Sequence, residues 1–134
     1  MLSGECFCGE IGYEISGEVF DARCCHCSRC RKAFSGSGSA YGLVRPEEFS
    51  WTRGTDLLQF YGSEDNAGLQ FCGKCGSTLC GLFAGEVHGV TLGCLNGDPP
   101  LTIARHIFTG SKASWDHIGG DAQQYDQWPT GDEA

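Results

Sequence analysis

The sequence predicts an all-β fold with little helix, in which short strands are joined by many turns. Glycine accounts for 21 of the 134 residues, and the apolar runs are short. Short apolar runs between glycines and polar clusters are typical of strands and turns rather than of amphipathic helices. A chain of 134 residues has the size of one domain and can bury a modest core. We therefore expect a single domain over residues 1–128 and a loosely held tail over residues 129–134.

The strands can be located in order from their residue patterns. Residues 10–16 alternate apolar and polar, which predicts a half-buried strand, and a second extended segment begins at Val19. Residues 27–34 suit a tight turn followed by a short helical turn, and Pro46 suits the first position of another. Residues 84–86 suit the turn of a hairpin. Further strands are expected over residues 40–44, 57–61, 69–71, 78–83, 87–92 and 103–108.

The ten cysteines are the most informative feature of the composition. The start of the chain, M-L-S-G-E-C, lacks the basic and apolar regions of a secretion signal, so we expect a cytoplasmic protein. Clustered cysteines in a reducing cytosol are typical of metal sites rather than of disulfides. No stretch approaches the ~18 apolar residues of a membrane span, so we expect no membrane partner.

The two outer cysteine pairs predict a zinc site that holds the fold together. Its predicted ligands are Cys6, Cys8, Cys72 and Cys75. Structural zinc sites use four protein ligands, and two short pairs far apart in sequence supply them. Gly9 and Gly76 follow the pairs, where a positive φ would let backbone N–H groups point at the sulfur atoms. The alternative, reduced core cysteines, does not explain the paired spacing.

The central segment C-C-H-C-S-R-C-R-K predicts a second zinc ion with one coordination position free for chemistry. Its predicted ligands, and the candidate catalytic residues, are Cys25, Cys27 and Cys30. Three protein ligands and an open fourth position are the arrangement of catalytic zinc. Two alternatives remain: Cys24 could supply a fourth ligand, or an iron–sulfur cluster could use four of these thiolates. His26 lies between two ligands and is a candidate to support the metal, to transfer protons or only to stabilise the fold.

The charge of the chain is −8 but is unevenly distributed. Residues 22–46 contain five basic side chains and no acidic one, so they could attract a small anionic ligand. The candidate anion-binding residues are Arg23, Arg29, Arg31 and Lys32. The alternative is a solvated loop with ordinary basic residues. The negative balance of the whole chain argues against a nucleic-acid partner.

Several other reactive or aromatic residues have simpler explanations. Cys80 and Cys94 lie in strand-like apolar runs and are expected to be buried as small hydrophobic residues. His88, in the predicted hairpin, and His106, in a predicted strand, are expected to be structural. Trp115 is expected either to plug the hydrophobic core or, with Lys112, to form part of a wall that holds an anion.

Taken in order, these motifs resemble the glutathione-dependent formaldehyde-activating enzyme (GFA) family. The similar segments are L-S-G-E-C-F-C-G-E-I-G-Y, C-H-C-S-R-C-R-K, F-C-G-K-C-G-S-T-L, R-H-I-F and S-K-A-S-W. The resemblance implies an Mss4-like, zinc-bridged fold of coiled antiparallel sheets, with a structural zinc on the outer pairs and a labile zinc on the central triplet. It also implies a carbon–sulfur lyase-type activity, in which glutathione adds to formaldehyde to give S-hydroxymethylglutathione.

The leading hypothesis is therefore a zinc enzyme that adds a small thiol, such as glutathione, to a small aldehyde. Bound Zn²⁺ would bring the thiol to its thiolate form, so no strong general base is required. Two alternatives remain at this stage. One is a non-catalytic zinc-binding module that binds or senses thiols or docks on a protein. The other is a zinc or redox sensor with a releasable metal.

Overall fold

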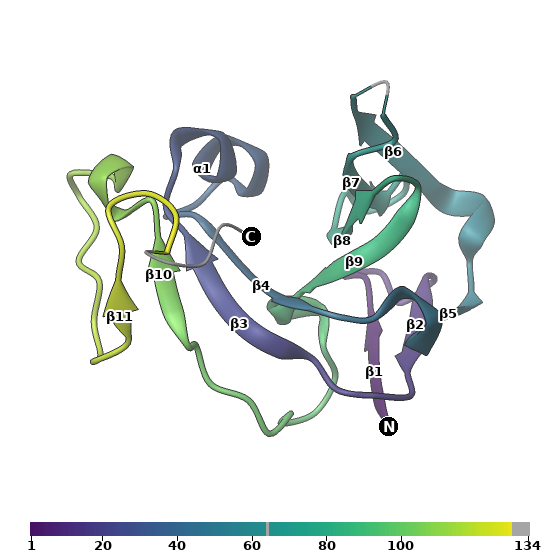
Figure 1. The fold of residues 1–134 in the computed structure, drawn as a ribbon. Helices are drawn as coiled ribbons and strands as arrows, with labels where there is room; N and C mark the ends of the chain where they lie inside the picture. The colour runs from purple at the N-terminus through teal and green to yellow at the C-terminus, as the bar shows by residue number, and fades with distance from the viewer. Residues whose placement is uncertain (64, 130–134) are drawn as a thin grey trace. The chain divides into compact units, whose positions relative to one another are not determined.

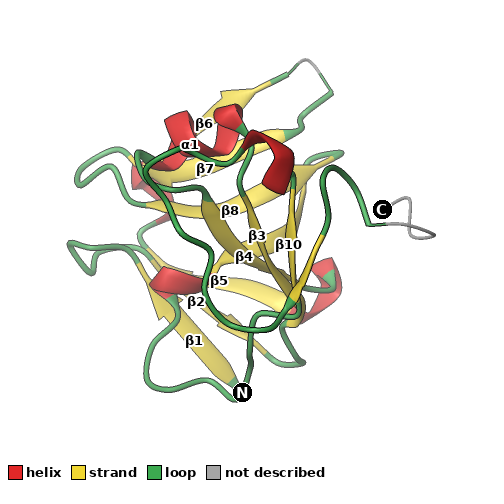
Figure 2. Ribbon diagram, turned by 90° about the vertical axis from the view of Figure 1, so that its left-hand side faces the viewer, coloured by secondary structure: helices red, strands yellow, loops and turns green. Residues whose placement is uncertain are grey.

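The structure is a computed structural model that describes residues 1–63 and 65–129. Strands and loops make up most of the described chain (Figure 2). It forms two compact units: the first comprises Met1–Phe20 with Gly42–Leu101, and the second comprises Asp21–Tyr41 with Thr102–Ala134. A single domain over residues 1–128 stays a prediction, and residues 130–134 of the predicted tail lie outside the described residues.

The first unit contains a three-stranded antiparallel sheet. In this sheet β2 (Gly12–Ile15) lies between β1 (Leu2–Glu5) and β5 (Phe49–Arg53). The ring of Tyr13, on β2, stacks on the ring of Phe49 with centroids 5.0 Å apart, which links two adjacent strands through their side chains. The expected strand at residues 10–16 is confirmed, whereas β1 and β5 were not predicted.

Four further strands of the first unit follow one another as an antiparallel meander (Figure 1). They are β6 (Leu58–Gly62), β7 (Gly68–Cys72), β8 (Thr78–Phe83) and β9 (Glu86–Thr91). Between β8 and β9 the turn residues Ala84 and Gly85 both have positive φ, 52° and 81°. Two consecutive positive φ values are typical of the type I′ turn that suits the twist of a hairpin. The predicted hairpin is therefore confirmed.

The core of the first unit includes sulfur atoms as well as aliphatic side chains. Its buried cluster comprises Cys6, Ile11, Tyr13, Ile15, Val19, Val44, Cys72, Leu79, Cys80, Val87 and Val90. Burying each large apolar side chain stabilises the fold by about 1.5–3 kcal/mol. Two residues from the predicted outer zinc site thus belong to the core. Short 3-10 turns lie at Pro46–Glu48, Thr55–Leu57 and Leu92–Cys94, and the first confirms the expected helical turn at Pro46.

The second unit is organised around a short central strand, β10 (Arg105–Ile107). This strand pairs in parallel with β3 (Phe20–Cys25) on one side and with β11 (Gln123–Gln124) on the other. Strand β4 (Ser39–Leu43) is the other neighbour of β3, and the boundary between the units falls within it, after Tyr41. A 3-10 turn at Thr109–Ser111 follows β10.

The short helix α1 (Ser28–Phe34) follows β3 in the second unit. It is the only α-helix among the described residues. Its N-cap is Cys27, whose sulfur accepts a hydrogen bond from the backbone N–H of Cys30 at 3.3 Å. The helix ends at Ser35, which adopts a left-handed conformation with φ 56°. The expected tight turn and helical turn at residues 27–34 are confirmed.

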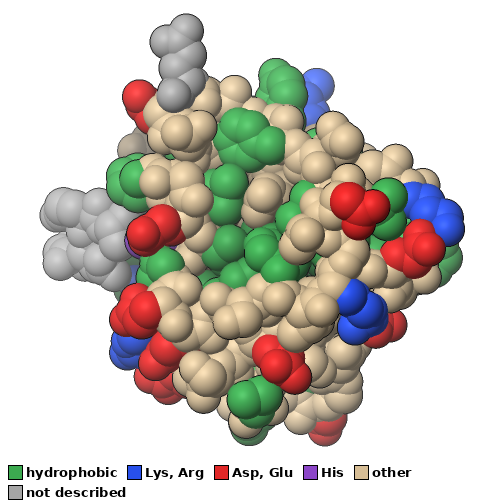
Figure 3. All heavy atoms as spheres, turned by 90° about the vertical axis from the view of Figure 1, so that its right-hand side faces the viewer, with side chains coloured by type: hydrophobic (Ala, Val, Ile, Leu, Met, Phe, Trp, Pro, Cys, Tyr) green, Lys and Arg blue, Asp and Glu red, His purple; other side chains and the backbone are tan. Residues whose placement is uncertain are grey.

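The predicted all-β fold with little helix is confirmed by this arrangement of strands. Among the described residues, no helix is both long and apolar enough to cross a membrane. On the face shown in Figure 3, acidic side chains are scattered widely, basic ones are few, and hydrophobic side chains gather in a central hollow. That distribution agrees with the net charge of −8.

Candidate metal centres

The two outer cysteine pairs converge in the first unit, as predicted. The group consists of Cys6, Cys8, Cys72 and Cys75, and its four sulfur atoms all lie within 4.8 Å of one another. The Sγ atom of Cys8 is 3.5 Å from that of Cys6 and 3.9 Å from that of Cys72. Four thiolates around a tetrahedral zinc, with bonds of about 2.3 Å, have sulfur atoms about 3.8 Å apart. The cluster therefore has the spacing that a tetrahedral metal ion requires.

Backbone N–H groups point at these sulfur atoms. The N–H groups of Lys74 and Cys75 each lie 3.4 Å from the sulfur of Cys72, and the N–H of Ile11 lies 3.4 Å from the sulfur of Cys6. The glycines that follow the pairs, Gly9 and Gly76, have φ values of 79° and 81°. The predicted positive φ at both positions is confirmed. These N–H donors stabilise the thiolate form that a metal requires.

The pKa of Cys75 shows the balance of forces on this cluster. Burial raises the pKa, but hydrogen bonds from the backbone of Ser77 and Cys8 and from neighbouring thiols outweigh it and lower the pKa to about 6. These hydrogen bonds therefore favour the thiolate form of Cys75, which is the form that binds a metal ion.

Arg53 holds the turn that follows the first cysteine pair, and it was not identified from the sequence. Its Nη2 and Nε atoms donate to the carbonyl oxygen of Gly9 at 2.8 and 3.1 Å, and Nη2 also donates to Glu5 Oε1 at 3.0 Å. Arg53 lies on β5, 44 residues from Gly9 in sequence. Only the pairing of β5 with β2 brings it to the turn.

The central triplet converges separately, in the second unit. The sulfur atoms of Cys25, Cys27 and Cys30 all lie within 4.8 Å of one another. Cys25 ends β3, Cys27 caps α1, and Cys30 lies in the first turn of that helix. Cys24 does not belong to the group, so the alternative in which it supplies a fourth ligand gains no support.

Within this cluster the thiols differ in acidity. A hydrogen bond from Cys25 is the main cause that lowers the pKa of Cys30, to about 6, and burial opposes it. The nearby side chains of Ser39 and Cys27, together with the charge of Arg29, lower that pKa further. The same bond raises the pKa of Cys25, because Cys25 is the partner that keeps its proton. Ser39 is buried on β4, and its role could not be read from the sequence.

Two histidines lie buried against each other in the second unit. His26 Nε2 and His106 Nδ1 are 3.0 Å apart, and the residues are only 5% and 9% exposed. Burial is the first cause that lowers the pKa of each imidazole below its usual value. The Nδ1 atom of His26 has no hydrogen-bond partner among the described residues, and the nearest acidic oxygen, Asp116 Oδ2, is 3.9 Å away.

This arrangement of cysteines can be compared with known proteins. A profile described as "Glutathione-dependent formaldehyde-activating enzyme" matches residues 1–111, which include both cysteine clusters. The chain belongs to this family. The crystal structure of a Rhodobacter sphaeroides protein is similar to this GFA-family chain, with 28% sequence identity and a TM-score of 0.59. That similarity covers 73% of this chain and 91% of the other. No curated protein matches the chain.

The four predicted anion-binding residues of this GFA-family chain lie in different surroundings. Arg29 and Lys32 are exposed on α1, and Arg31, on the same helix, donates from Nη2 to the carbonyl oxygen of Ser111 at 3.4 Å. Among the described residues, no ion pair joins these three to an acidic group. Arg23, in contrast, is 2% exposed and pairs with Asp21. Its predicted role in anion binding stays a prediction.

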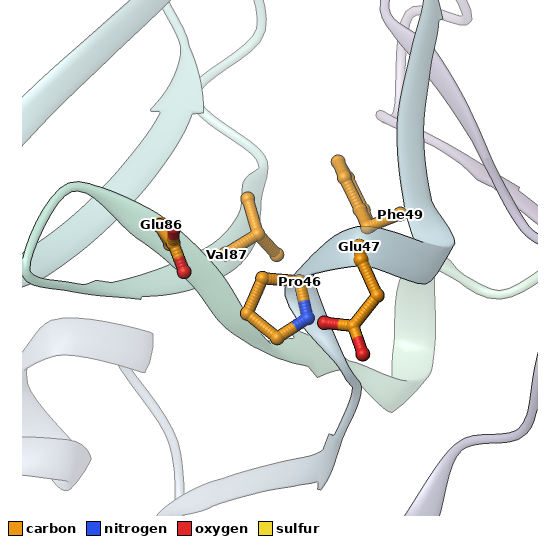
Figure 4. A pocket seen from close by; sticks show the side chains of 5 residues that line it. All are labelled: Pro46, Glu47, Phe49, Glu86 and Val87. Carbon is orange, nitrogen blue, oxygen red and sulfur yellow. The ribbon is translucent and has the colours of Figure 1, made fainter.

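A pocket in the first unit has no relation to either cluster. It is about 330 Å³ in volume and is lined by Pro46, Glu47, Phe49, Glu86 and Val87 (Figure 4). Its lining offers two carboxylates, apolar surface and no thiol or basic group. An anionic thiol would be repelled there, so this pocket does not fit the chemistry of the family.

The remaining residues singled out in the sequence are mostly structural. Cys80 is fully buried, as predicted, whereas Cys94 is only half-buried. His88 lies edge-on to the ring of Phe83, with centroids 5.7 Å apart. Trp115 is 71% exposed, so the expectation that it plugs the core was wrong. The charged end of Lys112 is held by the carbonyl oxygen of Asp116 at 2.9 Å.

Proposed function

We propose that this protein is a zinc-dependent enzyme of the carbon–sulfur lyase type that adds a small thiol, such as glutathione, to a small aldehyde. The observation that carries the proposal is the division of seven thiols into a group of four and a group of three. Family membership supports the chemistry at the family level. We further propose that the protein acts in the cytoplasm, where ten free thiols would stay reduced.

The donor sets fit zinc at both positions. Thiolate sulfur suits Zn²⁺ among the common divalent ions, and four thiolates close a structural site. In the four-cysteine cluster Cys6 and Cys72 are buried, so we assign that cluster to the fold. In the second cluster three residues would hold the ion: Cys25, Cys27 and Cys30. Three ligands leave a position for substrate, and we expect this zinc to be the more labile of the two.

The proposed reaction joins the sulfur of the thiol to the carbonyl carbon of the aldehyde. The carbon–oxygen double bond becomes a single bond, and the proton from the thiol ends on the new hydroxyl oxygen. When bound, zinc would lower the pKa of the thiol and polarise the carbonyl group. The neighbouring side chains of Cys25 and Ser39 lower the pKa of Cys30, which favours its thiolate and hence its readiness to act as a ligand.

The basic side chains of α1 would attract the carboxylates of a thiol such as glutathione. Arg29, Arg31 and Lys32 follow the cysteine triplet directly, and residues 22–46 contain no acidic side chain to compete with a ligand. The guanidinium group can hold a carboxylate through two parallel hydrogen bonds, so an arginine clamp is the natural form of this contact. The three side chains therefore supply binding and orientation rather than proton transfer.

The test is whether the protein accelerates the addition of glutathione to formaldehyde above the spontaneous rate. We expect Cys27→Ser to stay folded and to lose the acceleration, because the second cluster would keep only two of its thiols. Cys24→Ser is the matched control, since Cys24 lies beside the cluster but outside it, and it should behave like the wild type. If Cys27→Ser accelerates the reaction as well as the wild type does, the proposal is wrong. Thiol binding without any acceleration by the wild type would favour the non-catalytic zinc module.

A further inference from the structure

We infer that His106 is a positioning residue for the three-cysteine cluster, because its ring holds the His26 ring and thereby fixes the turn from Cys25 to Cys27. The two residues are 80 positions apart in sequence. His106 is not itself a member of the cluster. The sequence offered no reason to pair these two histidines.

Three successive contacts link β10 to the cysteine-bearing segment. Cys25 is paired with Ile107 in the parallel register of β3 and β10. The next residue, His26, donates its backbone N–H to the carbonyl oxygen of Ile107 at 3.0 Å. Its side chain then meets His106, with Nε2 and Nδ1 3.0 Å apart. Main chain and side chain of His26 are therefore held by the same short strand.

The position of His26 makes the side-chain contact consequential for the metal ligands. His26 stands between Cys25 and Cys27, so a rotation of its backbone would change the direction in which both sulfur atoms point. After Cys27 the chain enters α1. The backbone N–H of Cys30 donates to the sulfur of Cys27, which fixes these two ligands relative to each other. The contact of the His26 ring with His106 is thus a side-chain constraint on the direction of the turn, in addition to the backbone contacts.

The burial of the pair explains why the contact should be strong. His26 is 5% exposed, and its Nδ1 atom already has no hydrogen-bond partner among the described residues. Loss of His106 would leave Nε2 without its partner as well, and the backbone of Ser37 would be the polar group left beside the ring. A buried polar group without a partner is unfavourable, so the ring would turn towards water and carry the turn with it. The sulfur atoms would then be less well arranged for a common ion.

Groups that orient metal ligands without touching the metal typically change metal affinity by about 10–100-fold when they are removed. We expect a loss of this size in the second cluster for His106→Leu, which keeps the approximate volume but has no polar atom. His106→Asn should restore most of the affinity, because the Asn amide lies as many bonds from Cα as Nδ1 does. His117→Asn is the matched control, since His117 is exposed.

The measurement is competition for zinc with a chromophoric chelator, which reports the affinity of each site without any enzyme assay. The inference rests on the proposed function in one respect, that the three-cysteine cluster binds a metal ion. The four-cysteine cluster is an internal standard and should hold its zinc equally in every variant. Circular dichroism verifies that each variant is folded, and His26→Gln and His26→Leu repeat the comparison from the other partner if His106→Leu does not fold.

The outcomes separate the two claims. A wild-type protein that binds no second metal would sink the proposed function and, with it, this inference. If the wild type binds two metal ions and His106→Leu binds the second ion as tightly as the wild type does, the inference is overturned but the proposed function is not. It would be overturned equally if His106→Asn lost as much affinity as His106→Leu, because the packing volume and not the hydrogen bond would then be responsible. The inference is supported if His106→Leu lowers the zinc affinity of the three-cysteine cluster alone and His106→Asn restores it.

Discussion

Gly38→Ala is the substitution that tests the account of the second cluster most simply. Gly38 lies between α1 and β4 and has a φ of 157°, in a region that side chains rarely adopt. A Cβ atom there would collide with the carbonyl oxygen of Cys25 and would lie 3.3 Å from the Cα of His26. Both obstacles are backbone atoms, so they cannot rotate away. The added methyl group must push the cysteine-bearing turn itself.

The expected change in the free energy of unfolding for Gly38→Ala combines two destabilising effects and one stabilising effect. The unfavourable φ costs about 1–3 kcal/mol, and forcing a methyl group into packed backbone costs about 1–3 kcal/mol more. Restricting the unfolded chain returns about 0.4–1 kcal/mol. The net loss is then about 1–5 kcal/mol, which corresponds to a fall in melting temperature on the order of 10 °C. A domain stabilised by about 5–15 kcal/mol should still fold.

Gly36→Ala provides the control, because the nearest atom to a Cβ there is the carbonyl oxygen of Phe34 at 3.8 Å. We expect this variant to melt within a few degrees of the wild type or slightly above it. The assay is thermal unfolding followed by circular dichroism, with zinc release from each cluster measured on the same samples. Gly38→Ala should lose second-site affinity selectively. If both variants melt together and hold both metals equally, the steric reasoning is refuted.

Three further predictions follow from the two clusters and the basic helix. Cys75→Ser should leave the chain largely unfolded or insoluble, because structural zinc contributes on the order of 10–16 kcal/mol in small peptides; a soluble, folded variant by size exclusion and circular dichroism would contradict it. In metal-free protein, iodoacetamide should modify Cys30 increasingly as the pH rises through about 6 and then level off, since its lowered pKa makes the thiolate predominate above that pH. Peptide mass spectrometry should find Cys80 unmodified up to pH 8, because burial raises its pKa to about 12. Arg29→Gln should raise the KM for glutathione several-fold and change kcat little. Arg45→Gln is the control and should leave KM unchanged, because Arg45 already pairs with Glu18 at 3.5 Å. Equal KM values in both variants would remove Arg29 from the binding proposal.

Much of the fold could be predicted because its signals are local. The alternation at residues 10–16 predicted β2, and the run of apolar residues around Ala84 and Gly85 predicted the hairpin of β8 and β9. The split of cysteines into four and three was also visible, because each short pair or triplet carries its own turn. These features depend on residues within a few positions of one another.

The features that were missed depend on partners far away in the sequence. Strand β5 becomes a strand by pairing with β2, which begins 37 residues earlier, and it carries Arg53 to the carbonyl oxygen of Gly9. His106 was expected to be an ordinary strand residue, and only the parallel register of β3 and β10 brings it to His26. Trp115 was expected either in the core or in a wall that holds an anion, and its exposure rules out the first of these. No local pattern predicts such pairings.

The zinc content of the purified, reduced protein tests the central claim most directly. Elemental analysis with stepwise chelation should find two zinc ions per chain, of which one is released easily and one only as the protein unfolds. Cys27→Ser should lose the easily released ion and keep the other. A wild-type protein with no transition metal, or one in which Cys30 is locked in a disulfide, would contradict the account.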